Sequence, residues 1–193
     1  MHDGLSFKVN DNLYKDENAM PLNLINSNGN SSLFQVYSQL QFTFNEKWKS
    51  NVGVHYSSFR LNNSTSFEPR LNINYSLNDK SELSLSYGLH SQILPLPVYF
   101  VTQDDESNGV NSKNLELNKA HHIVLSHQYK FNNYTRIKTE VYHQRLFNVP
   151  VGLNENENYS IINQQFQYPR FALINEGKGR NTGIETTIER FMQ

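Results

Sequence analysis

Strict alternation of apolar and polar side chains is the feature that most constrains the fold of this chain. Across residues 34–44 the even positions carry Phe34, Val36, Ser38, Leu40, Phe42 and Phe44, whereas the odd positions are Gln, Tyr or Thr. A period of two residues places the two sets on opposite faces of a β-strand. After a turn at 45–47 the apolar series continues on the even positions. The pattern predicts a hairpin with Leu40 opposite Val52 and Val36 opposite Tyr56.

The same pattern recurs along the chain. Residues 71–77 and 83–89 alternate around a turn at 78–81, which predicts Leu77 opposite Leu83 and Ile73 opposite Tyr87. Residues 123–131 and 137–143 alternate around a turn at 132–134, residues 183–191 form a seventh strand, and Leu5, Phe7 and Val9 end an eighth. Because no stretch with a helical period competes, the sequence predicts an all-β, antiparallel, up-and-down fold.

The predicted connections are strongly asymmetric. The turns at 45–47, 78–81 and 132–134 are short, whereas the opposite connections at 60–69, 92–119 and 148–182 are long and polar. Short turns at one rim and long loops at the other are typical of outer-membrane β-barrels, and strands of about ten residues fit a tilted crossing of the bilayer. Aromatic residues near the strand ends match the interfacial girdles of such barrels.

Composition excludes several other classes of protein. The chain has no Cys, so disulfides, a thiol nucleophile and a zinc knuckle are excluded, and its net charge of −1 gives no basic nucleic-acid footprint. The chain has no run of 18 apolar residues, and because its first four residues lack a charged and an apolar region, no signal peptide is expected. The mean hydropathy of −0.65 fits a soluble β-sandwich or lipocalin-like barrel. It also fits a membrane barrel, in which only every second residue faces lipid. Loop asymmetry favours the membrane barrel.

No catalytic, cofactor or metal centre emerges from the residue pattern. His121 and His143 share a predicted face but lack a third ligand, and Ser126 and His127 point to opposite faces because they are adjacent on a strand. The acidic run at 104–106 lacks the ligand spacing of a calcium loop. Among the strand charges, Arg145 is exceptional, because it shares the apolar face with Val141; near the long-loop end it can snorkel or lie beyond the bilayer.

Several strings resemble TonB-dependent receptors of the Bacteroidetes, in the subgroup with a carboxypeptidase-regulatory-like N-terminal domain. They are EPRL at 68–71, YGLHSQ at 87–92, LPLPVYF at 94–100, NKAHH at 118–122, FNVPV at 147–151, NEG at 175–177 and GRNTGIE at 179–185. The resemblance covers most of the chain in the family's order. It implies a 22-stranded barrel, closed by an N-terminal plug, that imports a scarce nutrient with energy from the TonB complex. It implies no enzymatic activity and no cofactor.

The resemblance also indicates that residues 1–193 are a partial outer-membrane barrel domain of seven or eight strands, without the plug and the remaining strands. An open sheet edge in lipid leaves backbone groups unpaired, and single-chain bacterial barrels have even strand numbers. The expected location is the bacterial outer membrane. The expected partners are outer-membrane lipid, the TonB complex through parts outside this chain, a surface lipoprotein, and a small-molecule, peptide or glycan ligand; nucleic acid is not expected.

The main hypothesis is therefore one part of a TonB-dependent outer-membrane transporter. The alternatives are a small self-contained outer-membrane structural or adhesion barrel and a soluble β-sandwich binding module. If one segment contacts substrate, we expect it to be 92–118, where Pro95, Pro97, Tyr99 and Phe100 give a stiff aromatic loop. The same composition suits a structural clamp between loops, so no residue is assigned to substrate binding.

Overall fold

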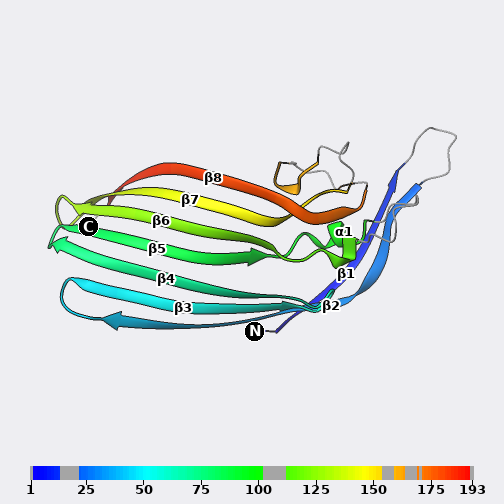
Figure 1. Cartoon of the computed structure of the whole chain (residues 1–193), viewed down its shortest axis with the longest axis horizontal. Coiled ribbons are helices and arrows are strands. Elements are labelled where there is room, and N and C mark those ends of the chain that lie inside the picture. Colours follow the sequence, from blue (N-terminus) through cyan, green and yellow to red (C-terminus); the bar gives the residue numbers. More distant parts are fainter. Residues whose placement is uncertain are drawn as a thin grey trace.

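The chain forms one eight-stranded antiparallel sheet in which every strand pairs with its neighbours in sequence (Figure 1). The computed structural model describes residues 2–13, 22–101, 112–153, 159–163, 169 and 171–191, with side chains from residue 29 onward. The strands are β1 His2–Leu13, β2 Leu22–Thr43, β3 Trp48–Phe59, β4 Ser64–Asn78, β5 Ser81–Gln92, β6 Asn118–Lys130, β7 Thr135–Gly152 and β8 Leu173–Arg190. This order confirms the all-β, up-and-down prediction, including the eighth strand.

Short helical turns lie in the long connections. They are α1 Leu96–Tyr99, η1 Ser112–Asn114 and η2 Ile161–Asn163. Where the chain is described, no helix is long and apolar enough to cross a membrane.

The strand registers confirm one predicted hairpin and correct another. Val36 faces Tyr56 and Leu40 faces Val52 in β2 and β3, as predicted. In β4 and β5, however, Ile73 faces Leu85 rather than Tyr87. An irregularity between Ser76 and Asn78 and a tight turn shift the pairing by two residues from a symmetric fold about position 80. Because the shift is two residues, each side chain keeps its predicted face.

The prediction of a long connection at 60–69 is wrong. β3 ends at Phe59 and β4 begins at Ser64, so only a four-residue turn remains. Asn63 adopts a φ of 59°, in the left-handed region that Asn tolerates. The Asn62 side chain also accepts a hydrogen bond from the Ser64 N–H at 3.1 Å. Asx turns of this kind reverse the chain without a long loop.

The predicted connection at 148–182 and the predicted strand bounds are also partly wrong. β7 continues to Gly152 and β8 begins at Leu173, so the connection shortens from both sides. β2 likewise begins at Leu22 rather than Phe34. These extensions are poor in alternating apolar residues, so a period of two did not reveal them. The connections at 93–117 and 153–172 are the long ones.

The sheet has one apolar and one polar face. The apolar face is formed by the alternating apolar residues of each strand, and these remain exposed: Leu40 is 62% exposed, Leu125 52% and Ile184 74%. The described part of the chain provides no second sheet over this face. Large apolar side chains left open along a whole sheet are expected where lipid, not water, is the solvent.

The buried core lies at the end of the sheet where the long connections meet, beside α1 (Figure 1). We call this cluster the loop cap; its buried members are Phe59, Leu94, Val98, Tyr99, Phe100, Val101, Leu115, Leu117 and Leu173. The rings of Phe59 and Tyr99 lie 5.3 Å apart between centroids. The Tyr99 hydroxyl accepts a hydrogen bond from the Leu94 N–H at 3.1 Å. The described parts of these connections are thus held together by packing.

Candidate ligand-facing site on the polar face

A pocket of about 290 Å³ opens on the polar face between β2 and β6. The strand registers place Gly53, Arg70, Gly88 and His122 in one row across four strands. Because the two glycines carry no side chain, the row is hollow on either side of Arg70. A Cβ at Gly88 would lie 2.5 Å from His90 Nε2, so the neighbouring imidazole already occupies the edge of this gap.

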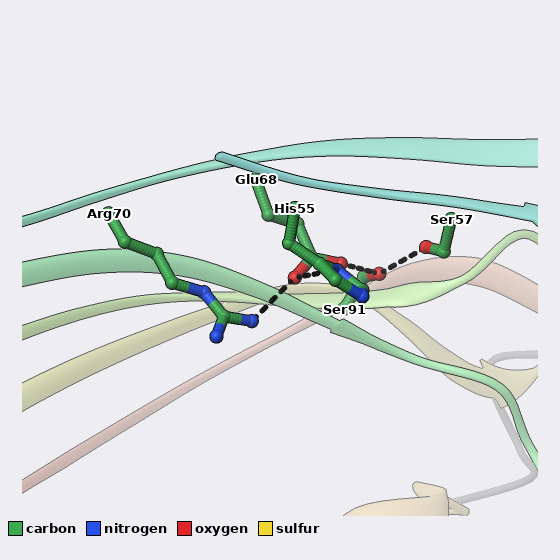
Figure 2. A network of polar contacts seen from close by, with 5 residues as sticks. All are labelled: His55, Ser57, Glu68, Arg70 and Ser91. Atoms are coloured by element: carbon green, nitrogen blue, oxygen red, sulfur yellow. Dashed lines mark hydrogen bonds and ion pairs between the residues drawn. The ribbon is translucent and has the colours of Figure 1, made fainter. Parts of the chain in front are cut away.

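A buried carboxylate lies between His55 and Arg70, two residues that line the pocket (Figure 2). Glu68 in β4 is only 1% exposed. Its Oε2 accepts hydrogen bonds from His55 Nδ1 at 3.0 Å and from Arg70 Nη2 at 3.2 Å. Its Oε1 accepts a hydrogen bond from the Ser91 hydroxyl, and the Ser57 and Ser91 Oγ atoms lie 3.4 Å apart. Three strands are therefore joined through one side chain.

The network also fixes which charge the pocket presents. A carboxylate without solvent is stable only when donors satisfy it, and Glu68 has three. Arg70 donates to Glu68 through one nitrogen, while its side chain remains 48% exposed toward the pocket. The rings of His90 and His122 lie 6.2 Å apart, edge to face, beside it. No Asp or Glu is among the described residues that line the pocket. The wall offers donors, a guanidinium and imidazoles, which suits a ligand group rich in oxygen acceptors.

The residues singled out from the sequence do not assemble into a catalytic or metal centre. His121 bonds to the Tyr87 hydroxyl at 3.0 Å, whereas His143 bonds to Thr182 Oγ1 at 2.7 Å. In the described residues no group of three His, Cys, Asp or Glu is placed to hold a metal ion. His127 Nε2 lies 2.7 Å from Ser81 Oγ, away from its neighbour Ser126. The acidic run at 104–106 lies outside the described residues.

The segment predicted to contact substrate is partly built into the loop cap. Tyr99 is fully buried and Phe100 is 9% exposed, so both rings face the cap core in this arrangement. Burial raises the pKa of the Tyr99 hydroxyl, which keeps it neutral. The arrangement corresponds to the structural clamp considered for these residues. Contact between 92–118 and a substrate stays a prediction.

Sequence reasoning missed the Glu68 network. Its members His55 and Glu68 lie on the polar positions of their strands, which is a usable signal, whereas Ser91 shares the parity of Leu85 and Leu89 and gives none. The register of β3 and β4 that brings them together cannot be predicted while residues 60–69 are assigned to a connection. With β4 starting at Ser64, His55 falls directly opposite Glu68.

Comparison with known proteins gives consistent results. A family model described as TonB dependent receptor-like, beta-barrel matches residues 2–191. No curated protein matches the chain. A mutant of the ferric enterobactin receptor PfeA from Pseudomonas aeruginosa is similar with a TM-score of 0.60 and 12% identity, over 84% of this chain and 25% of that one. The ferric-catecholate import receptor Fiu from E. coli K12, in its closed form, gives a TM-score of 0.63 and 12% identity, over 91% and 28%. The chain thus spans about a quarter of the length of these structures.

Proposed function

Because the chain belongs to the TonB-dependent receptor-like β-barrel family, a family of non-enzymatic bacterial outer-membrane transporters, we propose that it forms part of the wall of a transporter that takes up a scarce nutrient. The observation that carries the proposal is the division of one sheet into two faces. An apolar face left open by the fold meets lipid, while a polar face with a donor-lined pocket meets the aqueous path.

Residues 1–193 then correspond to a partial barrel domain. The edge of β2 beyond Phe34 and the outer edge of β8 have no neighbouring strand among the described residues. Unpaired backbone groups in lipid cost several kcal/mol each, so both edges require further strands. This need speaks against the alternative of a small self-contained barrel. The exposed apolar face speaks against a soluble β-sandwich.

The partners follow from the family and the resemblance noted in the sequence. Energy for uptake comes from the TonB complex, through a plug and contact segment outside these residues. The strings shared with Bacteroidetes receptors support the subgroup with a carboxypeptidase-regulatory-like domain and, with it, a surface lipoprotein partner. The two solved neighbours are named for ferric enterobactin and ferric catecholates, but identity of 12% shows the fold alone. The ligand class proposed here stays broad: a small molecule, peptide or glycan bearing oxygen acceptors.

Growth under nutrient limitation tests the proposal. The gene that encodes the chain is deleted in its native bacterium, and growth is measured on a panel of ferric siderophores, cobalamin, peptides and glycans as sole limiting sources. We expect loss of growth on at least one source, with the same loss in a strain lacking TonB and recovery on complementation. Normal growth on the whole panel, or a defect that is independent of TonB, would contradict the proposal.

A further inference from the structure

Two arginines face each other on the apolar side of the sheet. Arg145 in β7 lies directly opposite Arg180 in β8. Both are exposed, and both share the positions of apolar-face residues such as Val141 and Ile184. Side chains directly opposite in an antiparallel pair have Cβ atoms about 4.5–5.5 Å apart, and like charges at that spacing repel. An anion between or beside the two guanidinium groups would offset this repulsion.

Among the described residues, the surroundings of the pair add positive charge and supply no counter-ion. Lys119 in β6, two residues before the partner of Arg145, and Lys178, two residues before Arg180, extend the cluster. None of these four cations makes an ion pair with any residue that the structure describes. Of the nearby carboxylates, Glu116 accepts a hydrogen bond from Asn148 at 2.8 Å, and Glu176 is exposed at the bulged end of β8.

Aromatic rings mark the depth of this cluster in the membrane. His121, which pairs with Arg145, accepts or donates a hydrogen bond with the Tyr87 hydroxyl at 3.0 Å and stacks on Phe147 at 5.1 Å. Amphipathic rings gather where a barrel leaves the hydrocarbon for the headgroups. In β6, His121 lies eight residues from Tyr129 of the turn-side belt, about 26 Å along the strand at 3.3 Å per residue. At the tilt of such strands this is about 20 Å across the bilayer, so the arginines lie near the long-loop edge of the apolar band, and their long side chains reach the headgroups from there; in this family that side faces the cell exterior.

We propose that Arg145 and Arg180, with Lys119 and Lys178, bind the phosphate of a membrane lipid headgroup in the outer leaflet. A guanidinium pairs with phosphate through two parallel N–H donors, and two facing arginines present four such donors to one group. The apolar residues below them on the same strands, Val141 and Ile184, contact the acyl chains. The phosphate removes the repulsion between the arginines, so the lipid stabilises the β7–β8 pairing. This inference requires the outer-membrane location and is independent of the ligand that is transported.

Lipid titration of the purified full-length receptor that contains this chain, in dodecyl maltoside micelles, tests the site. The probes are lipid A with two phosphates, the same lipid A after dephosphorylation, and inorganic phosphate, with bound lipid counted by native mass spectrometry. We expect saturable binding of the phosphorylated lipid. The affinity should weaken about tenfold or more in Arg145→Gln/Arg180→Gln, because each cation near a headgroup strengthens binding severalfold. A matched variant, Lys47→Gln/Arg190→Gln, removes two cations from the turn-side rim and should bind as the unchanged chain does.

A charge-preserving variant keeps the test informative if the double Gln variant folds poorly. Arg145→Lys/Arg180→Lys should bind more weakly than the unchanged chain, because an ammonium lacks the paired donors, but more tightly than the double Gln variant, and Arg180→Gln alone should lose part of the binding. Equal binding of phosphorylated and dephosphorylated lipid A would overturn the proposal, as would unchanged binding by both Gln variants. Full competition by inorganic phosphate would show a site for the free ion and would overturn the assignment to a lipid.

Discussion

The Glu68 carboxylate lies 3.0 Å from His55 Nδ1, and the contact joins β3 to β4 on the polar face. Because Arg70 and Ser91 bond to the same carboxylate, one buried side chain connects three strands. We expect Glu68→Gln to lower the free energy of unfolding by about 1–3 kcal/mol, since the amide replaces one acceptor oxygen by a donor facing His55 or Ser91. Urea unfolding in detergent micelles measures the change.

Glu185→Gln is the matched control for this prediction. Glu185 lies on the same polar face in β8, is exposed, and makes no ion pair with a described residue. Its substitution should change the unfolding free energy by less than about 0.5 kcal/mol. Equal unfolding midpoints for the two variants would show that the buried network contributes nothing to stability.

Tyr99 should make the loop cap sensitive to alkaline pH. Burial raises the pKa of its hydroxyl above the usual value of 10.0, so the folded cap holds the proton more tightly than the unfolded chain does. The resulting stabilisation is complete below pH 10.0 and is lost as the pH rises through the raised pKa. Tyr99→Phe should remove this dependence while costing about 1 kcal/mol for the lost Leu94 hydrogen bond. Limited proteolysis between α1 and β6 across the alkaline range measures cap opening.

Burial also raises the pKa of Tyr159, one of the other ten of the eleven tyrosines, and Tyr159 packs against the cap, so Tyr159→Phe is tested beside Tyr99→Phe and should leave the Tyr99 part of the pH dependence in place. Tyr134→Phe, at the exposed turn between β6 and β7, provides the comparison. It should leave the pH of cap opening unchanged. Cap opening at the same pH in the unchanged chain and in Tyr99→Phe would contradict the assignment.

The pocket on the polar face should depend on Gly88 having no side chain. A phenylalanine there would displace the His90 ring, because a Cβ at this position would lie 2.5 Å from His90 Nε2, and would fill the space beside Arg70. If ligand passes along this wall, Gly88→Phe should reduce nutrient-limited growth through the transporter severalfold without loss of the protein from the outer membrane. Leu85→Phe, on the apolar face of the same strand, should leave growth unchanged. Similar growth of the two variant strains would remove the pocket from the ligand path.

Periodicity revealed the sheet but not its full extent. The faces of β2 to β7 followed from alternation alone, because lipid and water select opposite side chains at every second residue. Ser64 to Pro69 escaped this test, since Phe67 is the only large apolar side chain among them and Pro69 is unusual inside a strand. Alternation did not predict the loop cap either, because contacts such as Phe59 with Tyr99 join residues far apart in sequence and have no period. The Glu68 network was missed for the same reason, because it depends on the pairing of β3 with the first half of β4.

The single tryptophan offers a direct test of which face meets lipid. Trp48 is 43% exposed on the apolar face and lies 4.5 Å from the Tyr75 ring, beside the first short turn. In bilayers made with brominated phospholipids we expect strong quenching of its fluorescence, greater for bromine near the headgroup than at the chain end, because the ring lies in the interfacial belt. Trp48→Phe/Thr43→Trp moves the only indole to the polar face of β2, opposite Lys49 and thus one residue from the level of Trp48. That variant should be quenched by aqueous iodide and not by brominated lipid. Equal quenching of the two proteins by brominated lipid would mean that the apolar face does not select lipid over water, and the membrane orientation of the sheet would have to be abandoned.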